Sequence, residues 1–315
     1  MRDVFAIAAQ CLEEQRPFAL ATLVALREAA TAPLGTTIAV DEGGRIFGNV
    51  GAGCYESEIV EAALATAADG RTRRLDINLS SDDEFFGSGC GAVMQVVAWR
   101  PDASFADEAR AIAAGERAAR LHIPYDEADG SRVEFVHEVA PRDTLLLVGA
   151  TALAAELARI AARLDFRVVV IDPRPAFATS ERVPDAEIVR AWPDDYLPQA
   201  LSGRTAVVML SHDPKFDLPG LRCALRSNAP YIGLLGSRKS QDARRASLRA
   251  EGFEERELAR IHGPAGLDLG GVTIAETAVS ILAEIVASRR GGEGVPLRGA
   301  RGAIHRRSES LARQT

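Results

Sequence analysis

From Thr144 onward the sequence alternates short apolar runs with longer amphipathic runs, and this alternation constrains the fold more than any other feature of the chain. The apolar runs are TLLLVG (144–149), RVVVID (167–172), TAVVML (205–210) and YIGLLG (231–236). The stretch ALAAELARIAARL (152–164) has the three- and four-residue spacing of a helix. Continuous apolar strands joined by helices need right-handed crossovers and a parallel sheet covered on both faces. We therefore expect a Rossmann-like domain over residues 142–290.

Residues 1–100 have a different pattern, which predicts a separate mixed α/β domain. The apolar run at 18–26 is typical of a buried strand, and TTIAVDEGGRIFGNV (36–50) is typical of a hairpin. Residues 101–141 show no dominant period, and we interpret them as a connecting segment that could complete the first domain. The Gly- and Arg-rich end, residues 291–315, is expected to be a flexible tail. The predicted fold class is α/β, with a mixed α/β N-terminal domain followed by a Rossmann-like parallel-sheet domain.

Composition excludes several classes of protein. The 315 residues carry a formal charge of −7, which argues against nucleic acid as a general partner. No apolar run approaches the roughly 20 residues of a membrane span, and acidic residues come too early for a signal peptide. We therefore expect a cytoplasmic protein that binds neither nucleic acid nor membrane. The four cysteines form no CxxC pair, so we expect reduced thiols rather than a zinc site or disulfides.

One cysteine stands where a thiol has chemical consequences. The stretch VGAGCYESEIVEAAL puts Cys54 behind Gly51 and Gly53 and at the expected start of a helix. Unpaired backbone N–H groups and the helix dipole lower the pKa of a thiol there, which favours the thiolate. Cys54 is therefore a candidate nucleophile or ligand for a soft metal. The alternative is a small buried cysteine that fills a gap beside the glycines.

A second cysteine has similar surroundings. The stretch FFGSGCGAV surrounds Cys90 with three glycines, and this loop belongs to the same predicted domain as Cys54. Two loops of small residues that each present one thiol suggest a shared site. We therefore predict that Cys54 and Cys90 belong to one site.

The first strand-to-helix turn of the second domain has the position of a dinucleotide site without its full pattern. It reads GATA (149–152), and Asp172 ends the next strand about 20 residues later, as in dinucleotide sites. Glycines at such a turn let a pyrophosphate approach the helix N-terminus. Thr151 stands where the second glycine of that pattern removes side-chain bulk. We therefore expect poor NAD(P) binding, with Gly149 and Asp172 serving either a different ligand or the turn itself.

Polar clusters follow further strands of this domain. Ligands gather at the carboxyl ends of parallel strands, and a helix N-terminus beside an arginine suits a phosphate. The candidates are His212 and Asp213 after TAVVML, Gly236, Ser237 and Arg238 after YIGLLG, and His262 and Asp268 in RIHGPAGLDLGG. The alternatives are a histidine that only hydrogen-bonds its own loop at His212, a solvated charge at Arg238, and a simple turn in the last glycine-rich loop.

With these motifs the chain resembles the XdhC/CoxI family, the accessory factors of xanthine dehydrogenase and related molybdenum hydroxylases. In the first domain the resemblance rests on GRIFGNVGAGCYESEIVEAAL and GCGAVMQV, and in the second on VIDPRPAFATSERVPDA, LSHDPKFD, YIGLLGSRKS and RIHGPAGLDLGGVTIAETAVSILAEIVA. The resemblance places a family motif of a small residue, Cys, any residue and Glu at Cys54 and Glu56. Family members commonly have Gly-x-Gly-His at the first Rossmann turn, where this chain has GATA (149–152).

The resemblance implies a protein that binds the finished molybdenum cofactor, a molybdopterin with or without an attached nucleotide. It implies two partners, a cysteine desulfurase through which the cofactor gains its terminal sulfido ligand, and an apo-hydroxylase of the xanthine or carbon monoxide dehydrogenase type. The protein would be a chaperone rather than a catalyst. The phosphate of the cofactor suits a helix N-terminus, and the resemblance implies that the thiolates of Cys54 and Cys90 contact its dithiolene-bound molybdenum centre. The residues expected at the cofactor are Gly51, Gly53, Cys54, Glu56, Cys90, Gly149, Asp172, His212, Asp213, Gly236, Ser237, Arg238, His262 and Asp268.

Two other functions are compatible with the residues. An NAD(P)-dependent oxidoreductase is the main alternative, although the chain has neither an intact glycine pattern nor a proton-transfer set such as Tyr-x-x-x-Lys. A small-molecule sensor without catalysis is the third hypothesis. For the assembly, a homodimer is the working hypothesis.

Overall fold

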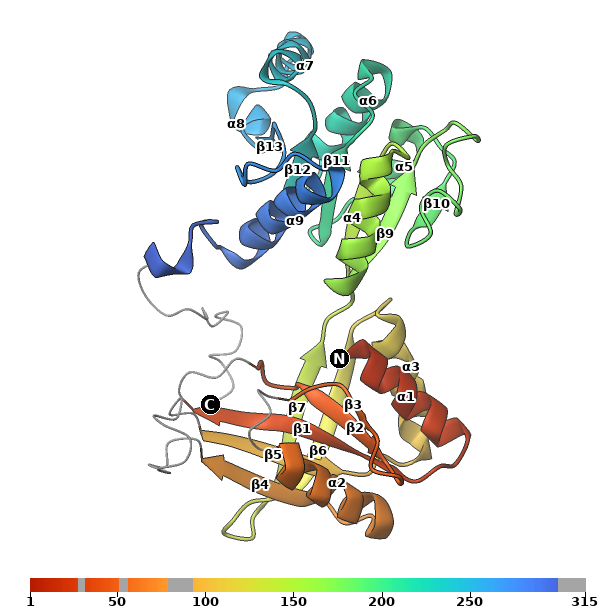
Figure 1. The fold of residues 1–315 in the computed structure, drawn as a ribbon, viewed down its shortest axis with the longest axis vertical. Helices are drawn as coiled ribbons and strands as arrows, with labels where there is room; N and C mark the ends of the chain where they lie inside the picture. Colours follow the sequence, from red (N-terminus) through yellow and green to blue (C-terminus); the bar gives the residue numbers. More distant parts are fainter. Residues whose placement is uncertain (28–31, 51–55, 79–92, 300–315) are drawn as a thin grey trace. The chain divides into compact units, whose positions relative to one another are not determined.

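The computed structural model describes residues 1–27, 32–50, 56–78 and 93–299 of the chain. The chain divides into two compact units, one over Met1–Pro141 and one that begins at Arg142 (Figure 1). Each unit has its own sheet and its own apolar core. The two units can therefore be described one at a time.

The first unit is built on an antiparallel sheet in the order β3-β2-β1-β5-β4. Its strands are β1 (Phe18–Arg27), β2 (Thr37–Asp41), β3 (Ile46–Phe47), β4 (Arg73–Asn78) and β5 (Val93–Trp99). A separate antiparallel hairpin consists of β6 (Ala119–Asp126) and β7 (Arg132–Val139). The helices are α1 (Arg2–Glu13), α2 (Glu56–Asp69) and α3 (Ala106–Ala114), and a 3-10 turn, η1 (Ala103–Phe105), precedes α3. The predicted strand and hairpin of this part are confirmed as β1 and the β2-β3 pair.

The alternation of side chains along β1 explains how this sheet is covered. Ala19, Ala21 and Leu23 lie on the face that packs against α2. Phe18 and Leu20 lie on the other face, in one cluster with residues of α1, α3 and the β6-β7 hairpin. Because both faces are buried, β1 is a continuous apolar run rather than an alternating one.

The segment of residues 103–139 contributes buried side chains to the core of the first unit. Ile112 of α3 and Leu121 of β6 are fully buried in the same apolar cluster as α1. Arg2 joins this segment to the N-terminal helix, because its guanidinium donates to the Ile112 carbonyl oxygen at 2.7 Å and to the Ala140 carbonyl oxygen at 2.8 Å. The segment interpreted from sequence as a connection thus carries a helix and a hairpin that pack against the first unit.

The second unit contains one sheet in the order β10-β9-β8-β11-β12-β13, and all of its strand pairs are parallel. The strands are β8 (Asp143–Val148), β9 (Phe166–Ile171), β10 (Glu187–Val189), β11 (Thr205–Met209), β12 (Tyr231–Leu234) and β13 (Ile261–His262). The helices are α4 (Ala152–Arg163), α5 (Pro193–Ala200), α6 (Pro214–Leu225), α7 (Arg238–Ala250), α8 (Glu255–Leu258) and α9 (Ile274–Arg290), followed by the 3-10 turn η2 (Leu297–Gly299). The mixed α/β unit followed by a Rossmann-like parallel sheet confirms the predicted fold class.

Helices cover both faces of this parallel sheet. Leu145 and Leu147 of β8 pack in one cluster with α4 and α9, which are drawn in front of the sheet in Figure 1. Leu146 and Val148 of the same strand pack in a second cluster with α5, α6, α7 and α8. The order of the strands reverses direction between β8 and β11. In open parallel sheets ligands bind outside the carboxyl ends of the strands at such a point.

The longest helix of this unit, α9, is fixed at both ends by its own sequence. Thr273 and Glu276 form the capping box that their three-residue spacing predicts, and Gly291 ends the helix with φ +65°. Ile281 and Ile285 are buried against α4. None of the helices in the described ranges is long and apolar enough to cross a bilayer.

Candidate functional site

The turn between β8 and α4 lies where the strand order reverses, and its own contacts close it. Gly149 has φ +112°, and a Cβ on it would lie 3.1 Å from the Ser211 nitrogen, so glycine is needed. Thr151 precedes α4 in an extended conformation, and its hydroxyl accepts a hydrogen bond from the Ala154 N–H at 3.2 Å. The side chain that interrupts the dinucleotide pattern is therefore the N-cap of α4.

Asp172, just after β9, is 1% exposed and is engaged by neighbouring donors. Its carboxylate accepts hydrogen bonds from the Ala150 N–H and the Arg174 N–H, each at 2.9 Å. The Arg174 guanidinium adds two more, at 2.9 Å from Nε and 2.6 Å from Nη2. Burial acts to raise the pKa of Asp172, but the hydrogen bonds outweigh burial and hold that pKa below its usual value. The acid that the sequence pattern assigns to a ribose is thus bound within the protein.

Asp172 holds Arg174 against a group of aromatic rings. The Arg174 guanidinium carbon lies 4.2 Å from the centre of the Phe177 ring and 5.2 Å from that of the Phe216 ring. Phe216 in turn stacks on Trp192 with 5.1 Å between ring centres. This cluster was not predicted from the sequence. The available signal was the loop DPRPAF, which places an arginine and a phenylalanine in the loop that follows an apolar strand.

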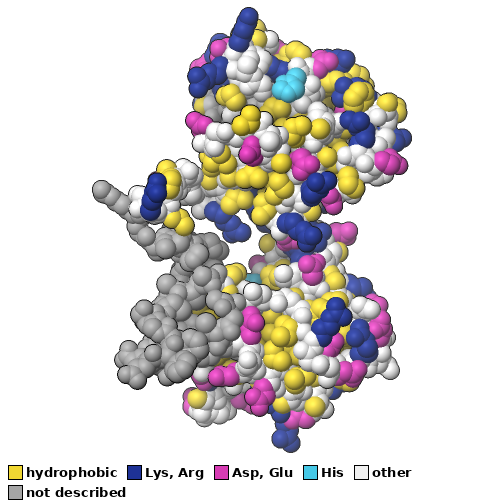
Figure 2. Space-filling model, in the orientation of Figure 1, with side chains coloured by type: hydrophobic (Ala, Val, Ile, Leu, Met, Phe, Trp, Pro, Cys, Tyr) yellow, Lys and Arg dark blue, Asp and Glu magenta, His cyan; other side chains and the backbone are white. Residues whose placement is uncertain are grey.

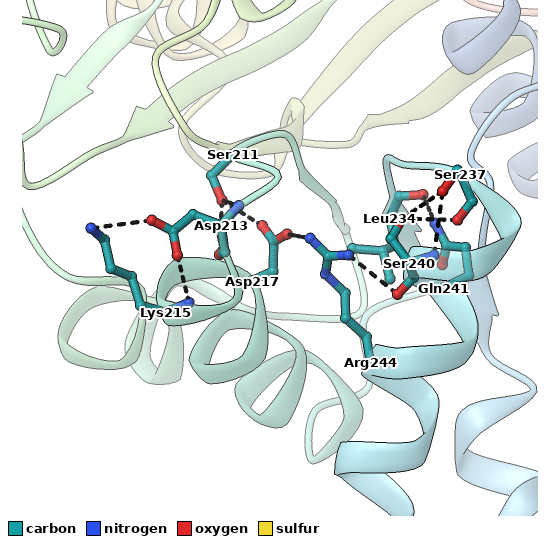
Figure 3. Close-up of polar contacts among 9 residues, drawn as sticks. All are labelled: Ser211, Asp213, Lys215, Asp217, Leu234, Ser237, Ser240, Gln241 and Arg244. Atoms are coloured by element: carbon teal, nitrogen blue, oxygen red, sulfur yellow. Dashed lines mark hydrogen bonds and ion pairs between the residues drawn. The ribbon is translucent and has the colours of Figure 1, made fainter.

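The loop after β11 joins α6 to α7 through buried polar groups. The Ser211 hydroxyl donates to Asp217 Oδ1 at 2.6 Å, and Arg244 Nη2 donates to Asp217 Oδ2 at 2.7 Å (Figure 3). The Arg244 and Asp217 side chains are 6% and 1% exposed. Arg244 Nη1 also donates to the Ser240 carbonyl oxygen at 3.2 Å, within α7. These contacts hold the start of α6 and the first turns of α7 together.

His212 and Asp213 lie in the same loop, closer to solvent. His212 has φ +57° and is exposed. The Asp213 carboxylate caps α6, accepting the Lys215 N–H at 3.0 Å, and lies 3.1 Å from Lys215 Nζ (Figure 3). The hydrogen bond from the Lys215 backbone is the main cause that holds the pKa of Asp213 below its usual value, and the charges of Lys215 and Arg174 add to it. Asp213 is therefore a carboxylate at neutral pH.

The loop after β12 leads into the 13-residue helix α7 and presents its N-terminus at the same sheet edge. Gly236 has φ +126°, and a Cβ on it would lie 2.6 Å from Ser240 Oγ. Ser237 is the predicted N-cap, and its hydroxyl accepts the Ser240 N–H at 3.3 Å. Arg238 and Lys239 are exposed, and neither forms an ion pair with another described residue. The helix dipole and two cations make this position suitable for an anion.

A histidine–carboxylate pair lies at the end of β13, whose last residue is His262. His262 Nδ1 lies 2.9 Å from Glu284 Oε1, and Glu284 Oε2 accepts the Tyr231 hydroxyl at 2.6 Å and the Gly266 N–H at 2.7 Å. The His262 and Tyr231 rings stack with 4.4 Å between their centres. Burial, reinforced by Glu284, raises the pKa of the Tyr231 hydroxyl, which therefore remains a neutral donor. Asp268 is exposed in the loop that leads to α9.

The structure brings the candidates of the second unit to one edge of the parallel sheet, because each of them lies at the carboxyl end of a strand or in the loop that follows it. Other residues link several of these candidates. The Gly149 turn lies against Ser211, which precedes His212 and Asp213. Arg174 donates a hydrogen bond to Asp172 and also interacts electrostatically with Asp213. His262 instead forms its own cluster with Glu284 and Tyr231. On the face drawn in Figure 2, basic and acidic side chains are interspersed over both units.

The candidates of the first unit lie mostly outside the described residues. Gly51, Gly53, Cys54 and Cys90 fall there, and Glu56 is the half-buried first residue of α2. Of the remaining thiols, Cys11 is buried and Cys223 is half-buried, and burial raises the pKa of both. Within the described ranges no three His, Cys, Asp or Glu side chains are grouped so that they could hold a metal ion.

Comparison with sequence models of known families gives matches in both units. Residues 145–285 match the model described as the XdhC Rossmann domain. Residues 11–78 match the model described as the XdhC and CoxI family. The two matched ranges fall one in each unit of the structure.

Individual relatives align along most of the chain. The chain is 26% identical to a probable subunit of xanthine dehydrogenase from Bacillus subtilis, with 89% of this chain and 95% of the relative covered. It is 25% identical to "Molybdenum cofactor insertion chaperone PaoD" of Escherichia coli, with 91% and 88% covered. A third relative, the uncharacterized protein YqeB of Escherichia coli, is 26% identical, and the alignment covers 93% of this chain but 47% of YqeB.

The fold also has a counterpart of known structure. A crystal structure described as a xanthine dehydrogenase from Bacillus halodurans superposes with a TM-score of 0.76. The superposition covers 93% of this chain and 98% of that one, at 21% sequence identity. At this identity the comparison establishes a shared fold.

Proposed function

This chain belongs to the XdhC and CoxI family, and from that membership we propose that it is a maturation chaperone of the molybdenum cofactor. It binds the finished cofactor, supports its sulfuration by a cysteine desulfurase, and inserts it into an apo-hydroxylase of the xanthine or carbon monoxide dehydrogenase type. The observation that carries the proposal is the alignment with a molybdenum cofactor insertion chaperone over 91% of the chain. That alignment spans both units rather than the Rossmann-like unit alone.

The described residues fit the anionic end of such a cofactor. The N-terminus of α7 offers the Ser237 cap together with the exposed Arg238 and Lys239. An N-terminal helix end with two adjacent cations favours a phosphate over a neutral ligand. Gly236 lets the loop reach this helix closely, since a Cβ there would collide with the first turn. We assign the phosphate of the cofactor to Ser237, Arg238 and Lys239.

We assign the metal end of the cofactor to Cys54 and Cys90. Burial keeps Cys11 and Cys223 in the thiol form, which is a poor ligand, so neither suits this role. Glu56 opens α2, where the helix dipole favours a carboxylate, and its charge stands two residues from Cys54. When bound, the cofactor supplies a molybdenum centre held by a dithiolene, and this chain's residues hold and shield it.

The other strand-end candidates are assigned positioning roles. Asp172 fixes Arg174, Asp213 caps α6, and Gly149 allows the close turn against the loop after β11. Glu284 orients the His262 ring, and His212 and Asp268 remain exposed for contact with the cofactor or a partner. None of these groups forms a nucleophile–base pair typical of a catalyst, in the part of the chain that the structure describes.

The experiment is to purify the full chain from a molybdenum-replete host and to measure molybdopterin after oxidation to its fluorescent pterin. Wild-type protein should carry the pterin, and Cys54→Ala should lose it while keeping the far-UV circular dichroism of the wild type. Cys223→Ala is the matched control, because it removes a thiol from the second unit and should retain the cofactor. Full occupancy in Cys54→Ala would exclude the thiolate contact, and absence of pterin from the wild type would exclude the function.

A further inference from the structure

A group of aromatic and basic side chains at the carboxyl edge of the second unit is assigned no part of the ligand in the function proposed above. It is formed by Arg174, Phe177, Arg182, Trp192, Lys215 and Phe216, which we call the aromatic–basic patch. These residues come from the loop after β9, the residue before α5 and the first turn of α6, elements that Figure 1 shows in one part of the unit.

The exposure of two rings in the patch is unusual for this protein. Phe177 is 41% and Trp192 is 44% exposed, and every other described phenylalanine and tryptophan is at least half-buried. Phe216, by contrast, is 3% exposed and forms the buried base on which Trp192 stacks. Trp192 is thus held on a buried base, and Phe177 lies against the Arg174 guanidinium. Both rings keep part of their surface in water, which offers flat apolar area for a planar ligand.

The patch also has spare hydrogen-bond donors held in fixed positions. Arg174 gives Nε and Nη2 to Asp172, and its Nη1 makes no hydrogen bond to another described residue. Lys215 Nζ lies 4.9 Å from the centre of the Phe216 ring and forms an ion pair with Asp213. An ammonium has three donors, so two remain. These donors suit the oxygens of a phosphate beside the exposed rings.

The charge of the patch is positive on a chain that is negative overall. Asp172 and Asp213 balance Arg174 and Lys215, and the guanidinium of Arg182 stands over the Phe177 ring at 5.4 Å. Arg182 has no ion-pair partner among the described residues. The chain as a whole carries a formal charge of −7. A ligand that matches the patch therefore combines a planar ring with a negative charge.

We propose that the aromatic–basic patch binds a nucleotide, with its base against Phe177 and Trp192 and its phosphate on Arg174, Arg182 and Lys215. The site differs from the ribose contact of a dinucleotide fold, because the Asp172 carboxylate that would take a ribose is already bound to Arg174. Two sources offer this chemistry, a free nucleotide and the nucleotide end of an extended molybdopterin. Only the second source rests on the proposed function.

The experiment is a titration of the full chain with GMP, CMP and AMP, followed by tryptophan fluorescence. Trp192 lies in the patch, whereas the second tryptophan, Trp99, is buried in the first unit. All three nucleotides are expected to quench the emission, and inorganic phosphate and ribose 5-phosphate should bind at least about fivefold more weakly, the lower end of base–aromatic stacking. No binding of any nucleotide, or equal binding of inorganic phosphate, would overturn the proposal.

Variants test the residues of the patch. Phe177→Leu removes the ring but keeps apolar surface, and Arg182→Ala removes the unpaired cation, so each should weaken nucleotide binding at least about fivefold. Arg226→Ala is the matched control, because Arg226 also lies over a phenylalanine ring, at 5.5 Å from Phe253, outside the patch. Unchanged affinity in both patch variants would overturn the assignment, as would an equal loss in Arg226→Ala.

A separate assay distinguishes the two sources and separates this inference from the proposed function. Acid hydrolysis of the purified protein would release a nucleotide together with the pterin if the patch holds an extended molybdopterin, and pterin alone if the patch serves a free nucleotide. A protein that carries no pterin but binds GMP, CMP or AMP would support the nucleotide site at the aromatic–basic patch and contradict the proposed chaperone function. A protein that carries pterin but binds none of the three contradicts the patch alone.

Discussion

Asp217 of α6 and Arg244 of α7 form an ion pair inside the second unit, with 2.7 Å between Oδ2 and Nη2 and almost no exposure of either side chain. The Asp217 carboxylate also accepts the Ser211 hydroxyl, so its oxygens are satisfied by one cation and one neutral donor. The pair fixes two helices whose first turns both belong to the candidate site. Its integrity therefore affects both the stability and the shape of the site.

Loss of Arg244 should lower the free energy of unfolding more than loss of an exposed arginine does. Arg244→Met leaves the Asp217 charge buried without a cation, and we expect it to lower the free energy of unfolding by about 3–5 kcal/mol. The measurement is urea unfolding followed by circular dichroism. Arg249→Met is the control, because the Arg249–Glu255 pair is largely exposed, so its loss should change the free energy of unfolding far less than loss of Arg244. Equal stability of the two variants would contradict the assignment.

The pH dependence of stability should carry a contribution from Asp172. Its pKa in the folded protein lies below the unfolded value of about 3.9, so its contribution is complete above that pH and disappears as pH falls through the folded pKa. Asp172→Asn should therefore be less stable than the wild type at pH 7, by about 1–3 kcal/mol. The difference should narrow below about pH 4. A constant difference in urea midpoints between pH 7 and pH 3 would exclude this linkage.

The chain should bind NAD(P)H poorly because Thr151 closes the turn after β8. Calorimetric titration with NADH and NADPH should give no dissociation constant in the micromolar range, which would correspond to about −8 kcal/mol. Thr151→Gly removes the side-chain bulk and should bind more tightly than the wild type, at a cost of a few tenths of a kcal/mol in stability, since glycine is a tolerated N-cap. Micromolar binding that persists in Phe177→Leu would favour the oxidoreductase hypothesis, because it could not be assigned to the aromatic–basic patch.

Arg238 should contribute directly to retention of the cofactor. Arg238→Ala removes one cation at the start of α7 and should weaken binding by about 1–3 kcal/mol, the scale of a charge-assisted hydrogen bond. The pterin that remains bound after extended dialysis is the measurement. Arg256→Ala is the matched control, because Arg256 is an exposed arginine on α8 of the same unit. If both variants retain the same amount of pterin, the phosphate lies elsewhere.

The sequence was sufficient to predict the fold wherever hydrophobic period and caps agreed. Four strands of the parallel sheet, β8, β9, β11 and β12, stand out as apolar runs, and Ser237 and Thr273 mark helix starts by the chemistry of N-caps. The short edge strands β10 and β13 were not predicted, because three and two residues are too few to show a period. The β6-β7 hairpin was missed. Its buried residues alternate with exposed ones, but Pro124 and several charged residues obscure the pattern, and one of the two helices that it packs with, α1, lies at the chain start.

The positions of the site residues could be predicted from the sequence, but the side-chain contacts between them could not. Parallel topology places strand ends at one edge, so the sequence indicates His212, Ser237 and His262 as neighbours of that edge. The partners Glu284 and Arg244 lie 22 and 27 residues from the groups that they bind, inside helices whose pattern is amphipathic. A local pattern carries no record of such pairs, because they form only when the helices pack on the sheet.

The position of β8 in the sheet has a consequence during synthesis of the chain. β8 is the first strand of its unit, yet it pairs with β9 on one side and with β11 on the other. During synthesis, β8 and β9 are the first strands of this unit to leave the ribosome. The edge of β8 that pairs with β11 then has no partner until residues 205–209 have been made. A nascent or truncated chain that ends before Thr205 therefore presents an apolar strand edge that can pair with another chain, and it should aggregate more readily than the complete protein.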